Sequence, residues 1–280
     1  MIAAMRDFEL LFDHSEGRGQ SESTTATYGK LVFPPPPPNR PWIYANFVQT
    51  LDGIVSLLGD EAGGADIGGL DEDRWLMDLL RAHADAVILG MGTLREEQKM
   101  ARPRPRGPVF RIVDDALLQL RAKLGRGRQR NIFVTAHANF QMSDYAVFDG
   151  EFVDVTVVTT REGARNLQSQ PHSSADIIAV DADGAGVDLH QAVAALSERY
   201  GIRYLLSEGG PQLYSALLTA GLIDEKFLTV SPLEAGALSP SGPRPTVLPN
   251  VSFTRQTAPR WSWLSCRKVE DYQFHRFRRK

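Results

Sequence analysis

Short apolar runs alternate with amphipathic segments along most of the chain, from residue 41 to residue 230. Continuous apolar runs of strand length are typical of strands that are covered on both faces. The segments between them repeat their apolar positions every three or four residues, as helices with one buried face do. We therefore predict strands at residues 42–49, 86–89, 109–113, 131–135, 153–159, 176–180, 203–206 and 226–230.

The helices that this pattern predicts have recognisable ends. Asp71 precedes an amphipathic helix at residues 72–84, and Asp188 precedes another that stops near Gly201. Aspartate is a preferred N-cap residue, and glycine is common just after a helix. Pro211 suits the first turn of a third helix. Because strands and helices alternate, we expect an α/β fold with a mainly parallel central sheet and helices on both faces.

The C-terminal part of the chain departs from this alternation. Residues 235–250 are rich in glycine, proline and serine, which predicts a long loop. Residues 261–278 contain two extended pieces, with Glu270 and Asp271 at the turn between them. This pattern predicts a C-terminal antiparallel hairpin that closes one edge of the sheet.

The N-terminal part has a different character. Residues 8–12 predict one short amphipathic turn of helix, and residues 34–38 are an uninterrupted proline run that favours a stiff polyproline II spacer. A docking site for a proline-binding partner is the alternative interpretation of this run. We expect globular structure to start at Pro41, and we divide the chain into an N-terminal extension with a proline-rich spacer at residues 1–40 and a single domain at residues 41–280.

Composition narrows the classes of function. The formal net charge of −3 argues against electrostatic binding of nucleic acid. Cys266 is the only cysteine, which excludes an internal disulfide or a zinc site with several thiolates and suits a reducing compartment. No apolar run approaches the ~20 residues of a membrane-spanning helix, and acidic residues near the N-terminus argue against a signal peptide. We therefore expect a cytoplasmic protein without nucleic-acid or membrane partners.

Several kinds of catalytic centre are also excluded by motif. The six histidines are scattered without metal-ligand spacing, so we expect no metal site. The chain has neither a GxxxxGK[ST] phosphate loop nor a GxSxG nucleophile elbow. It also lacks the HxE and PCxxC motifs of the zinc deaminases.

Three glycine-containing junctions follow predicted strands, at residues 50–53 (TLDG), 89–93 (LGMGT) and 207–211 (SEGGP). The carboxyl ends of parallel strands are where open α/β sheets bind ligands. Glycines ahead of a helix let a ligand approach the backbone, and the free N–H groups there attract phosphate. The glycine-bearing segment 59–69 is a candidate for a loop that closes over such a ligand.

Each junction also has a simpler interpretation. The 89–93 segment lacks the third glycine of a dinucleotide fingerprint, because Arg95 stands there, and a tight turn explains it equally well. The alternative for Glu208 is that its negative charge lies near the start of a helix and interacts with the helix dipole. Asp52 and Gly53 form a common turn pair.

Taken in order, TLDG, LLRAHADAVILGMGT and EGGPQLYSALLTAGLIDE resemble the reductase domain of the riboflavin-biosynthesis deaminase–reductase family, over residues 41–280. The resemblance implies a dihydrofolate-reductase-like fold, a homodimer and NADPH as the cofactor. It implies reduction of the ribose of a 5-amino-6-(5-phosphoribosylamino)uracil, with hydride transfer to C1′. The positions that it assigns to the cofactor are Gly90, Gly92, Thr93, Glu97, Thr135, Gly209, Gly210, Pro211, Gln212 and Leu213.

The resemblance also implies a substrate side. Arg81 and Arg104 match residues that bind the substrate phosphate, and Glu208 matches a carboxylate at the substrate end. For Arg81, a helix ion pair with Asp78 or Asp85 is the alternative. We name Asp52 and Glu208 as candidates for proton transfer.

Two positions on the substrate side depart from the family pattern. Asn46 stands where a lysine is usual, and Ala65 stands where a serine is usual. These departures do not affect the residues assigned to the cofactor, but they could change which substrate the protein binds. Asn46 is therefore a candidate substrate-binding residue of altered chemistry. The alternatives are a reductase of another heterocycle, such as a dihydrofolate or pteridine, and a non-catalytic nucleotide-binding homologue.

Overall fold

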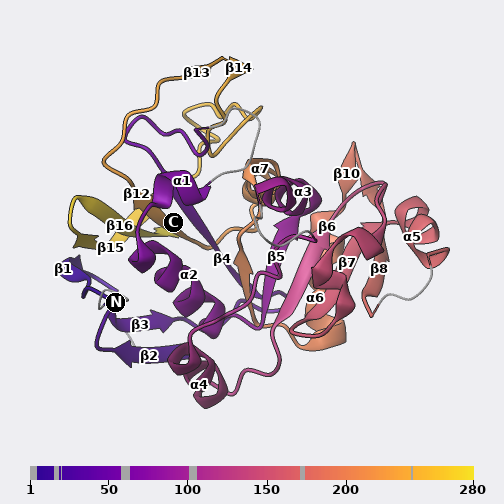
Figure 1. Ribbon diagram of the computed structural model, residues 1–280, viewed down its shortest axis with the longest axis horizontal. Coiled ribbons are helices and arrows are strands. Elements are labelled where there is room, and N and C mark those ends of the chain that lie inside the picture. Colours follow the sequence, from indigo (N-terminus) through magenta and orange to yellow (C-terminus); the bar gives the residue numbers. More distant parts are fainter. Residues whose placement is uncertain are drawn as a thin grey trace.

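A computed structural model describes residues 5–15, 19, 21–57, 64–100, 106–170, 174–240 and 242–280. Within these residues one large sheet runs through the molecule (Figure 1). Its strands, in spatial order, are β1 (Glu9–Asp13), β15 (Trp261–Val269), β16 (Tyr272–Arg279), β12 (Glu225–Val230), β4 (Trp42–Gln49), β11 (Tyr204–Ser207), β5 (Ala86–Gly90), β6 (Arg130–Val134), β7 (Asp154–Thr160) and β8 (Asp176–Val180).

The sheet is parallel from β12 to β8 and antiparallel from β12 to β1. The predicted mainly parallel sheet and the C-terminal hairpin are therefore confirmed. Adjacent strand residues point to opposite faces, so Tyr44 joins one hydrophobic core and Ile43 joins the other. The helices are α1 (Gly64–Gly68), α2 (Asp71–His83), α3 (Met91–Met100), α4 (Asp115–Lys123), α5 (Arg161–Gln168), α6 (Leu189–Tyr200) and α7 (Pro211–Thr219).

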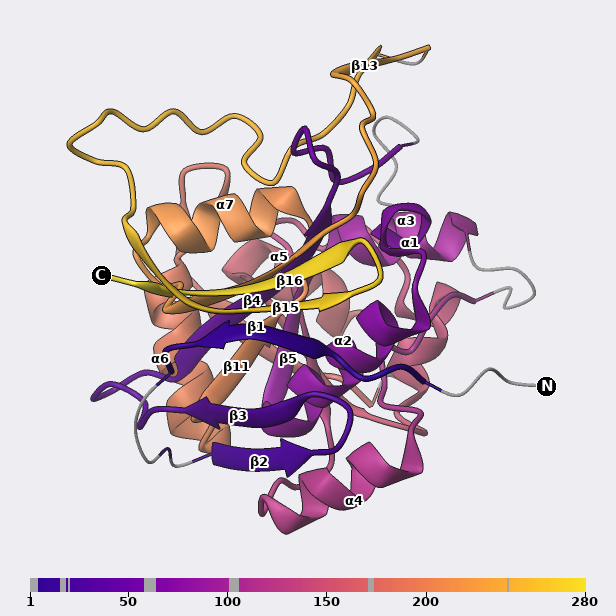
Figure 2. The same ribbon diagram turned by 90° about the vertical axis from the view of Figure 1, so that its left-hand side faces the viewer.

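The loops contain several shorter elements. They are the 3₁₀ turns η1 (Met142–Asp144) and η2 (Ala146–Asp149) and the two-stranded pieces β2 (Ser21–Thr25), β3 (Gly29–Phe33), β9 (Ala182–Asp183), β10 (Gly186–Val187), β13 (Leu238–Ser239) and β14 (Gly242–Pro243). The small β13–β14 hairpin stands out from the body of the molecule, within the long loop predicted before the C-terminal hairpin (Figure 2).

Three of the predicted helix ends are confirmed and one is shifted. The Asp188 side chain accepts a hydrogen bond from the Gln191 backbone N–H, and Gly201 closes the same helix in the left-handed conformation. Pro211 is the first residue of α7. Asp71 is not an N-cap, because Leu70 occupies that position and Asp71 is already helical. Its charge still favours the positive end of the helix dipole.

The strand predicted at residues 109–113 is wrong. That segment has no regular structure, because β6 already pairs with β5 on one side and β7 on the other. Side chains satisfy its carbonyl groups instead. The Asn131 amide donates to the carbonyl oxygens of Val109 and Phe110, and the Gln129 amide also donates to that of Phe110.

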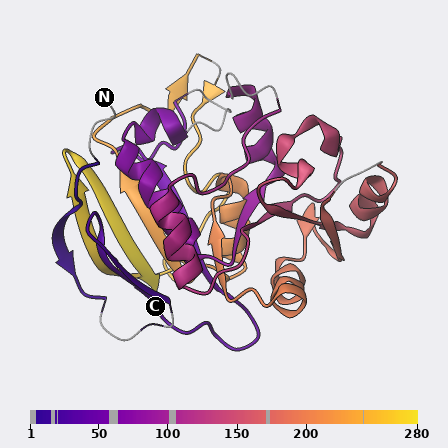
Figure 3. The same ribbon diagram turned by 60° about the horizontal axis from the view of Figure 1, so that its bottom comes forward.

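The helical turn predicted at residues 8–12 is also wrong, since this segment forms β1. The outer edge of β15 offers unpaired backbone groups, and β1 pairs with it in antiparallel register. The indigo N-terminal strand lies beside the yellow C-terminal hairpin at one edge of the molecule (Figure 3). Phe8 is buried against Tyr28 and Phe274, so this pairing also contributes to the core.

Globular structure therefore begins well before Pro41. Two buried arginines of the C-terminal hairpin donate to backbone carbonyls of the β2–β3 hairpin. Arg267 binds the carbonyl oxygens of Tyr28 and Lys30, and Arg276 binds that of Val32 at 2.6 Å. The N-terminal extension is thus built into the sheet and its core, and the proline run 34–38 leads from β3 into β4.

His83 of α2 makes hydrogen bonds to the β2–β3 hairpin. The two ring nitrogens of His83 lie 2.8 Å from the hydroxyl oxygens of Ser21 and Ser23. Burial lowers the pKa of His83 to about 3, so the ring is neutral in the folded protein. This contact places the hairpin against the helix that also lines the cleft described below.

We predict that Phe33→Ala destabilises the protein strongly. Phe33 is fully buried and packs against Tyr44, Tyr204 and Phe227, so its removal leaves a cavity that costs about 3–5 kcal/mol of unfolding free energy. Leu10→Ala is the control, because Leu10 lies in the same extension with half its surface exposed. Urea unfolding measures both variants; equal stability of the two would contradict the burial of the extension.

Candidate active site

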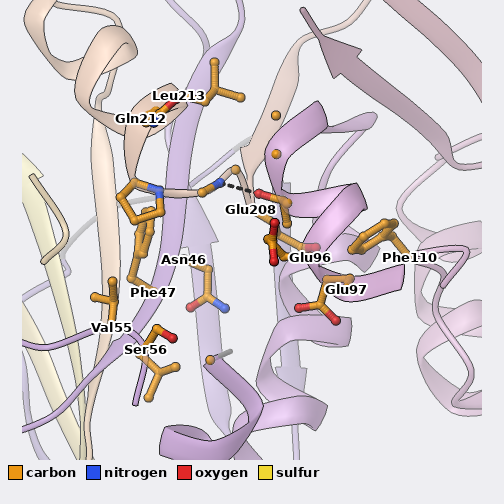
Figure 4. A pocket seen from close by; sticks show the side chains of 18 of the residues that line it. Asn46, Phe47, Val55, Ser56, Glu96, Glu97, Phe110, Glu208, Gln212 and Leu213 are labelled. Atoms are coloured by element: carbon orange, nitrogen blue, oxygen red, sulfur yellow. Dashed lines mark hydrogen bonds between the residues drawn. The ribbon is translucent and has the colours of Figure 1, made fainter. Parts of the chain in front are cut away.

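A cleft of about 1420 Å³ opens at the carboxyl ends of β4, β5, β6 and β11. This is the sheet edge at which the sequence predicts a ligand. In Figure 4, Asn46 and Glu97 lie around the same cavity. The predicted site residues that line it are Asn46, Arg81, Gly90, Gly92, Thr93, Glu97, Thr135, Glu208, Gly209, Gly210, Pro211, Gln212 and Leu213.

Two of the glycine junctions lie side by side in this cleft. They follow β5 and β11, which are parallel neighbours, and the Gly210 backbone N–H donates to the Thr93 hydroxyl at 2.7 Å. A Cβ atom on Gly210 would lie 2.9 Å from that hydroxyl oxygen, and one on Gly209 would lie 2.7 Å from the Leu213 side chain. A side chain at either position would therefore force Thr93 or Leu213 to shift.

The start of α7 is suited to an anion. Its N-cap, Gly210, has no side chain to satisfy the first backbone N–H groups of the helix, which remain available at the cleft. The N-terminus of α3 begins at the neighbouring junction, at Met91. Two helix N-termini at one end of a cleft form a favourable environment for the negative charges of a pyrophosphate.

Arg81 is held in a buried ion pair with Glu208. The guanidinium donates from Nε and Nη2 to the two carboxylate oxygens of Glu208, at 2.7 and 2.6 Å. Both side chains are more than nine-tenths buried, at 6% and 7% exposure. Burial lowers the pKa of Arg81, but the charges and hydrogen bonds of Glu208 and Asp78 outweigh that effect and raise it overall.

The remaining donors of Arg81 are also occupied. Nη1 donates to Asp78 and to the carbonyl oxygen of Arg111, and the second N–H of Nη2 faces the sulfur of Met77. An arginine has five N–H donors, and all five have an acceptor here. Arg81 therefore positions Glu208 rather than offering donors to a substrate phosphate. The ion pair with Asp78 that we weighed as an alternative is present; Asp85 pairs with Arg126 instead.

Other cations of the cleft have free donors. Arg74, Arg95 and Arg111 line the cavity, and none of the three guanidinium groups makes an ion pair within the described ranges. Arg74 is not among the site residues predicted from the sequence, although its spacing from Arg81 could have indicated it. Arg74 precedes Arg81 by two helical turns, which places both side chains on one face of α2.

The carboxyl group of Glu97 faces the cavity without a hydrogen bond or ion pair to any residue of the described part of the chain (Figure 4). Burial raises the pKa of Glu97, and the Glu208 charge raises it further, against the opposing charges of Arg81 and Arg74. Glu97 thus differs in protonation behaviour from an ordinary surface glutamate.

Asp52 does not line the cleft. Its carboxylate accepts hydrogen bonds from the Thr50 hydroxyl and from the backbone N–H groups of Ala235 and Gly236. Chiefly the Thr50 hydroxyl lowers the pKa of Asp52 to about 2. The structure therefore gives Asp52 a role in holding the loop after β12, and the proton-transfer role that we considered has no geometric support.

Of the other predicted residues, Asn46 and Thr135 line the cleft, and the side chains of the rest are not described by the structure. The side-chain oxygen of Asn46 is buried in the cleft wall without a hydrogen-bond partner among the described residues, which leaves an acceptor for a ligand. Thr135 lines the cleft beyond the end of β6. Arg104 lies outside the described residues, as do residues 59–63 of the predicted loop, and the side chain of Ala65 is not described.

The structure supports no metal centre or membrane segment in the residues that it describes. Among them, no three His, Cys, Asp or Glu side chains gather closely enough to hold a metal ion. None of the described helices has the length and apolarity needed to cross a bilayer.

Comparison with known proteins identifies the family. The model of the RibD C-terminal domain matches residues 41–269. The chain belongs to the RibD C-terminal domain family. The resemblance recognised in the sequence is thereby confirmed. The family match begins at residue 41, so β1, β2 and β3 lie outside the matched residues.

Curated relatives of this RibD C-terminal domain protein come from archaea. One is the 2,5-diamino-6-ribosylamino-4(3H)-pyrimidinone 5′-phosphate reductase of Archaeoglobus fulgidus, 26% identical over 78% of this chain and 90% of that protein. The protein of the same name from Methanothermobacter thermautotrophicus is 27% identical over 70% of this chain and 80% of its own length.

Solved structures share the fold. A pyrimidine reductase-like protein of Corynebacterium diphtheriae has a TM-score of 0.65 and 23% identity, covering 86% of this chain and 93% of that one. RibD of Acinetobacter baumannii has a TM-score of 0.61 and 17% identity over 87% of this chain. The present chain spans only 59% of the A. baumannii protein. The expected dihydrofolate-reductase-like α/β fold is confirmed.

We predict that Arg81→Ala and Arg74→Ala differ sharply in stability. Loss of Arg81 leaves Glu208 and Asp78 buried without their cation, which costs about 3–5 kcal/mol of unfolding free energy. Arg74 is an exposed side chain of the same helix, so its loss changes the unfolding free energy by less than about 0.5 kcal/mol. Thermal and urea unfolding test this contrast. An Arg81→Ala protein as stable as the wild type would show that Arg81 is free to bind substrate.

Proposed function

We propose that this protein is an NADPH-dependent reductase of the riboflavin-biosynthesis type, acting on a phosphorylated ribosylaminopyrimidine. The observation that carries the proposal is the pair of glycine junctions, joined by the Gly210–Thr93 hydrogen bond, at the head of a cleft with room for two ligands. Membership of the RibD C-terminal domain family and curated relatives that are reductases support the same reaction.

The cofactor fits the junction side of the cleft. The residues that would hold it are Gly90–Thr93 on one junction and Gly209–Leu213 on the other, with the pyrophosphate at the α7 N-terminus and the adenosine end toward Thr135. When bound, NADPH supplies the hydride. The chain's own contribution is to hold the reacting carbon beside it, exclude water and supply a proton.

The substrate occupies the α2 side of the cleft in this proposal. Arg74 takes the phosphate, assisted by Arg111, because every donor of Arg81 is used inside the protein. Arginine suits this task because its planar donors match phosphate oxygens. Asn46 presents a neutral amide to the pyrimidine where the family usually has a lysine.

The curated relatives favour one substrate over another. Both act on the 2,5-diamino-pyrimidinone 5′-phosphate, which has an amino group where the uracil implied by the sequence resemblance has a carbonyl group. Asn46 has an unpaired acceptor oxygen that an amino group can satisfy. We therefore propose the 2,5-diamino compound as the preferred substrate and the uracil as the competitor to be compared.

The homodimer and the cytoplasmic location stay predictions. Exposed apolar side chains on the outer strands support a dimer, since Leu10 and Leu11 of β1 and Trp263 of β15 are each about half exposed at one edge of the sheet. Sedimentation of the full chain measures the oligomeric state.

We predict that the purified protein binds NADPH more tightly than NADH and oxidises it when given the phosphorylated pyrimidine. Fluorescence titration measures binding, and loss of the reduced-nicotinamide absorbance measures turnover. Gly210→Ala places a methyl group against Thr93, so it weakens NADPH binding by roughly tenfold or more, equivalent to about 1.4 kcal/mol. Binding without turnover on any pyrimidine or pterin would favour the non-catalytic alternative, and turnover on a pterin alone would favour the other heterocycle.

We predict that Arg74→Ala raises KM for the phosphorylated substrate by roughly tenfold or more, since a hydrogen-bonded charge contact contributes about 1.5–3 kcal/mol. Its NADPH dissociation constant stays at the wild-type value. The dephosphorylated substrate is the matched control, because Arg74→Ala leaves its KM unchanged. An equal rise in KM for both substrates would contradict the phosphate contact.

A further inference from the structure

We infer that Glu97 is the general acid of the reduction, donating the proton that accompanies hydride transfer to the substrate. The inference rests on the proposed function and names a catalytic residue for it. It assigns Glu97 a second role beyond the cofactor contact that the family resemblance implies.

The two carboxylates first considered for proton transfer cannot do it. Asp52 lies outside the cleft, with its oxygens bound by Thr50, Ala235 and Gly236. Glu208 lies in the cleft, but both of its oxygens accept short hydrogen bonds from Arg81. Both oxygens of Glu208 are thus engaged as the counter-ion of a buried arginine, and this geometry gives Glu208 a positioning role.

Glu97 has the opposite surroundings. Its side chain comes from the α3 helix, next to the glycine junction that would hold the cofactor, and it faces the cavity. No described residue donates a hydrogen bond to its carboxyl group. Partial burial and the nearby negative charge of Glu208 favour the neutral acid, and Arg81 and Arg74 of α2 are the charged groups that oppose it. Two carboxyl groups with divergent surroundings are the usual arrangement for separating acid and anion roles.

Other carboxyl groups also line the described cleft. Asp78 and Glu96 are held in ion pairs with Arg81 and Lys99, and Asp71 is exposed, which leaves Asp73 of α2 as the main rival. Burial also raises the pKa of Asp73, but its carboxyl oxygen accepts a hydrogen bond from the Thr229 hydroxyl at 2.6 Å. Asp73 is therefore already engaged with β12, and Arg74 is the charged neighbour that affects it. Glu97 alone of the two interacts electrostatically with the Arg81–Glu208 pair beside the glycine junctions.

The proposed step balances. In the ring-opened substrate, C1′ is joined to the exocyclic nitrogen by a C=N double bond. C1′ accepts a hydride from NADPH, the π electrons of the double bond move to nitrogen, and nitrogen takes the proton from the Glu97 carboxyl group. The products are the ribityl amine, NADP⁺ and the Glu97 carboxylate. The carboxylate then takes up a proton from water through the open cleft, so one proton is consumed in each turnover.

The test compares Glu97→Gln with the wild type at saturating NADPH and substrate. The amide keeps the shape of the side chain and removes the proton, so kcat falls by roughly 100-fold or more. The dissociation constant for NADPH, measured by fluorescence titration without substrate, stays within threefold. Wild-type kcat declines as pH rises through the pKa of Glu97, because the acid form is required, and this decline disappears in Glu97→Gln.

Three further variants complete the test: Glu97→Asp, Asp73→Asn and Glu96→Gln. Glu97→Asp keeps a carboxyl group and therefore retains the pH dependence at a lower rate, even if Glu97→Gln folds poorly. Asp73→Asn keeps the pH dependence of the wild type. Glu96→Gln is the matched control on the same helix, since Glu96 pairs with Lys99, and its kcat stays within about twofold of the wild type.

Three results would overturn the inference. Weaker NADPH binding by Glu97→Gln with an unchanged kcat would make Glu97 a cofactor contact only. Loss of the pH dependence in Asp73→Asn, with its retention in Glu97→Gln, would transfer the role to Asp73. A wild-type protein that binds NADPH but reduces no pyrimidine would refute the proposed function itself, and that outcome is established before any variant is measured.

Discussion

The buried ion pair between Arg81 and Glu208 is the contact on which the cleft depends. It joins α2, which carries the cleft-lining Arg74, to the glycine junction between β11 and α7. Two charges leave water only where geometry and further hydrogen bonds compensate for their desolvation, and all five donors of Arg81 are satisfied here. The pair therefore fixes the relative positions of the two halves of the site, at the cost of removing both residues from direct chemistry.

This division of labour explains the arrangement of charge around the cavity. All donors of Arg81 are used inside the protein, so our proposal assigns the substrate phosphate to cleft-lining arginines on the same helix and the adjoining loop. Glu208 is engaged by Arg81, so our inference assigns proton donation to a second carboxyl group of the cleft, that of Glu97. Glu208 and Glu97 share one cleft, yet Glu208 is paired with a buried arginine, whereas Glu97 has no ion-pair partner among the described residues.

The N-terminal extension gives this member of the RibD C-terminal domain family a larger sheet than the matched domain contains. Strand β1 covers the free edge of the C-terminal hairpin, and the β2–β3 hairpin covers α2 and the hydrophobic core beneath it. Arg267 and Arg276 bind its backbone carbonyls from the hairpin strands. Because α2 carries both Arg74 and Arg81, the extension supports the helix that shapes the substrate side without reaching the cleft itself.

The sequence by itself determined the elements whose signals are local. Strand and helix periodicity, the Asp188 cap, the Pro211 helix start and the glycine junctions predicted the parallel sheet, its active edge and the family. Tertiary structure decided what depends on distant partners. Residues 8–12 became a strand because the edge of β15 was free, and residues 109–113 did not because both edges of β6 were occupied. The hydrogen-bond partners of Arg81 and Asp52 were also decided by tertiary structure, because Glu208, Ala235 and Gly236 lie far away in the chain, where no spacing rule reveals them.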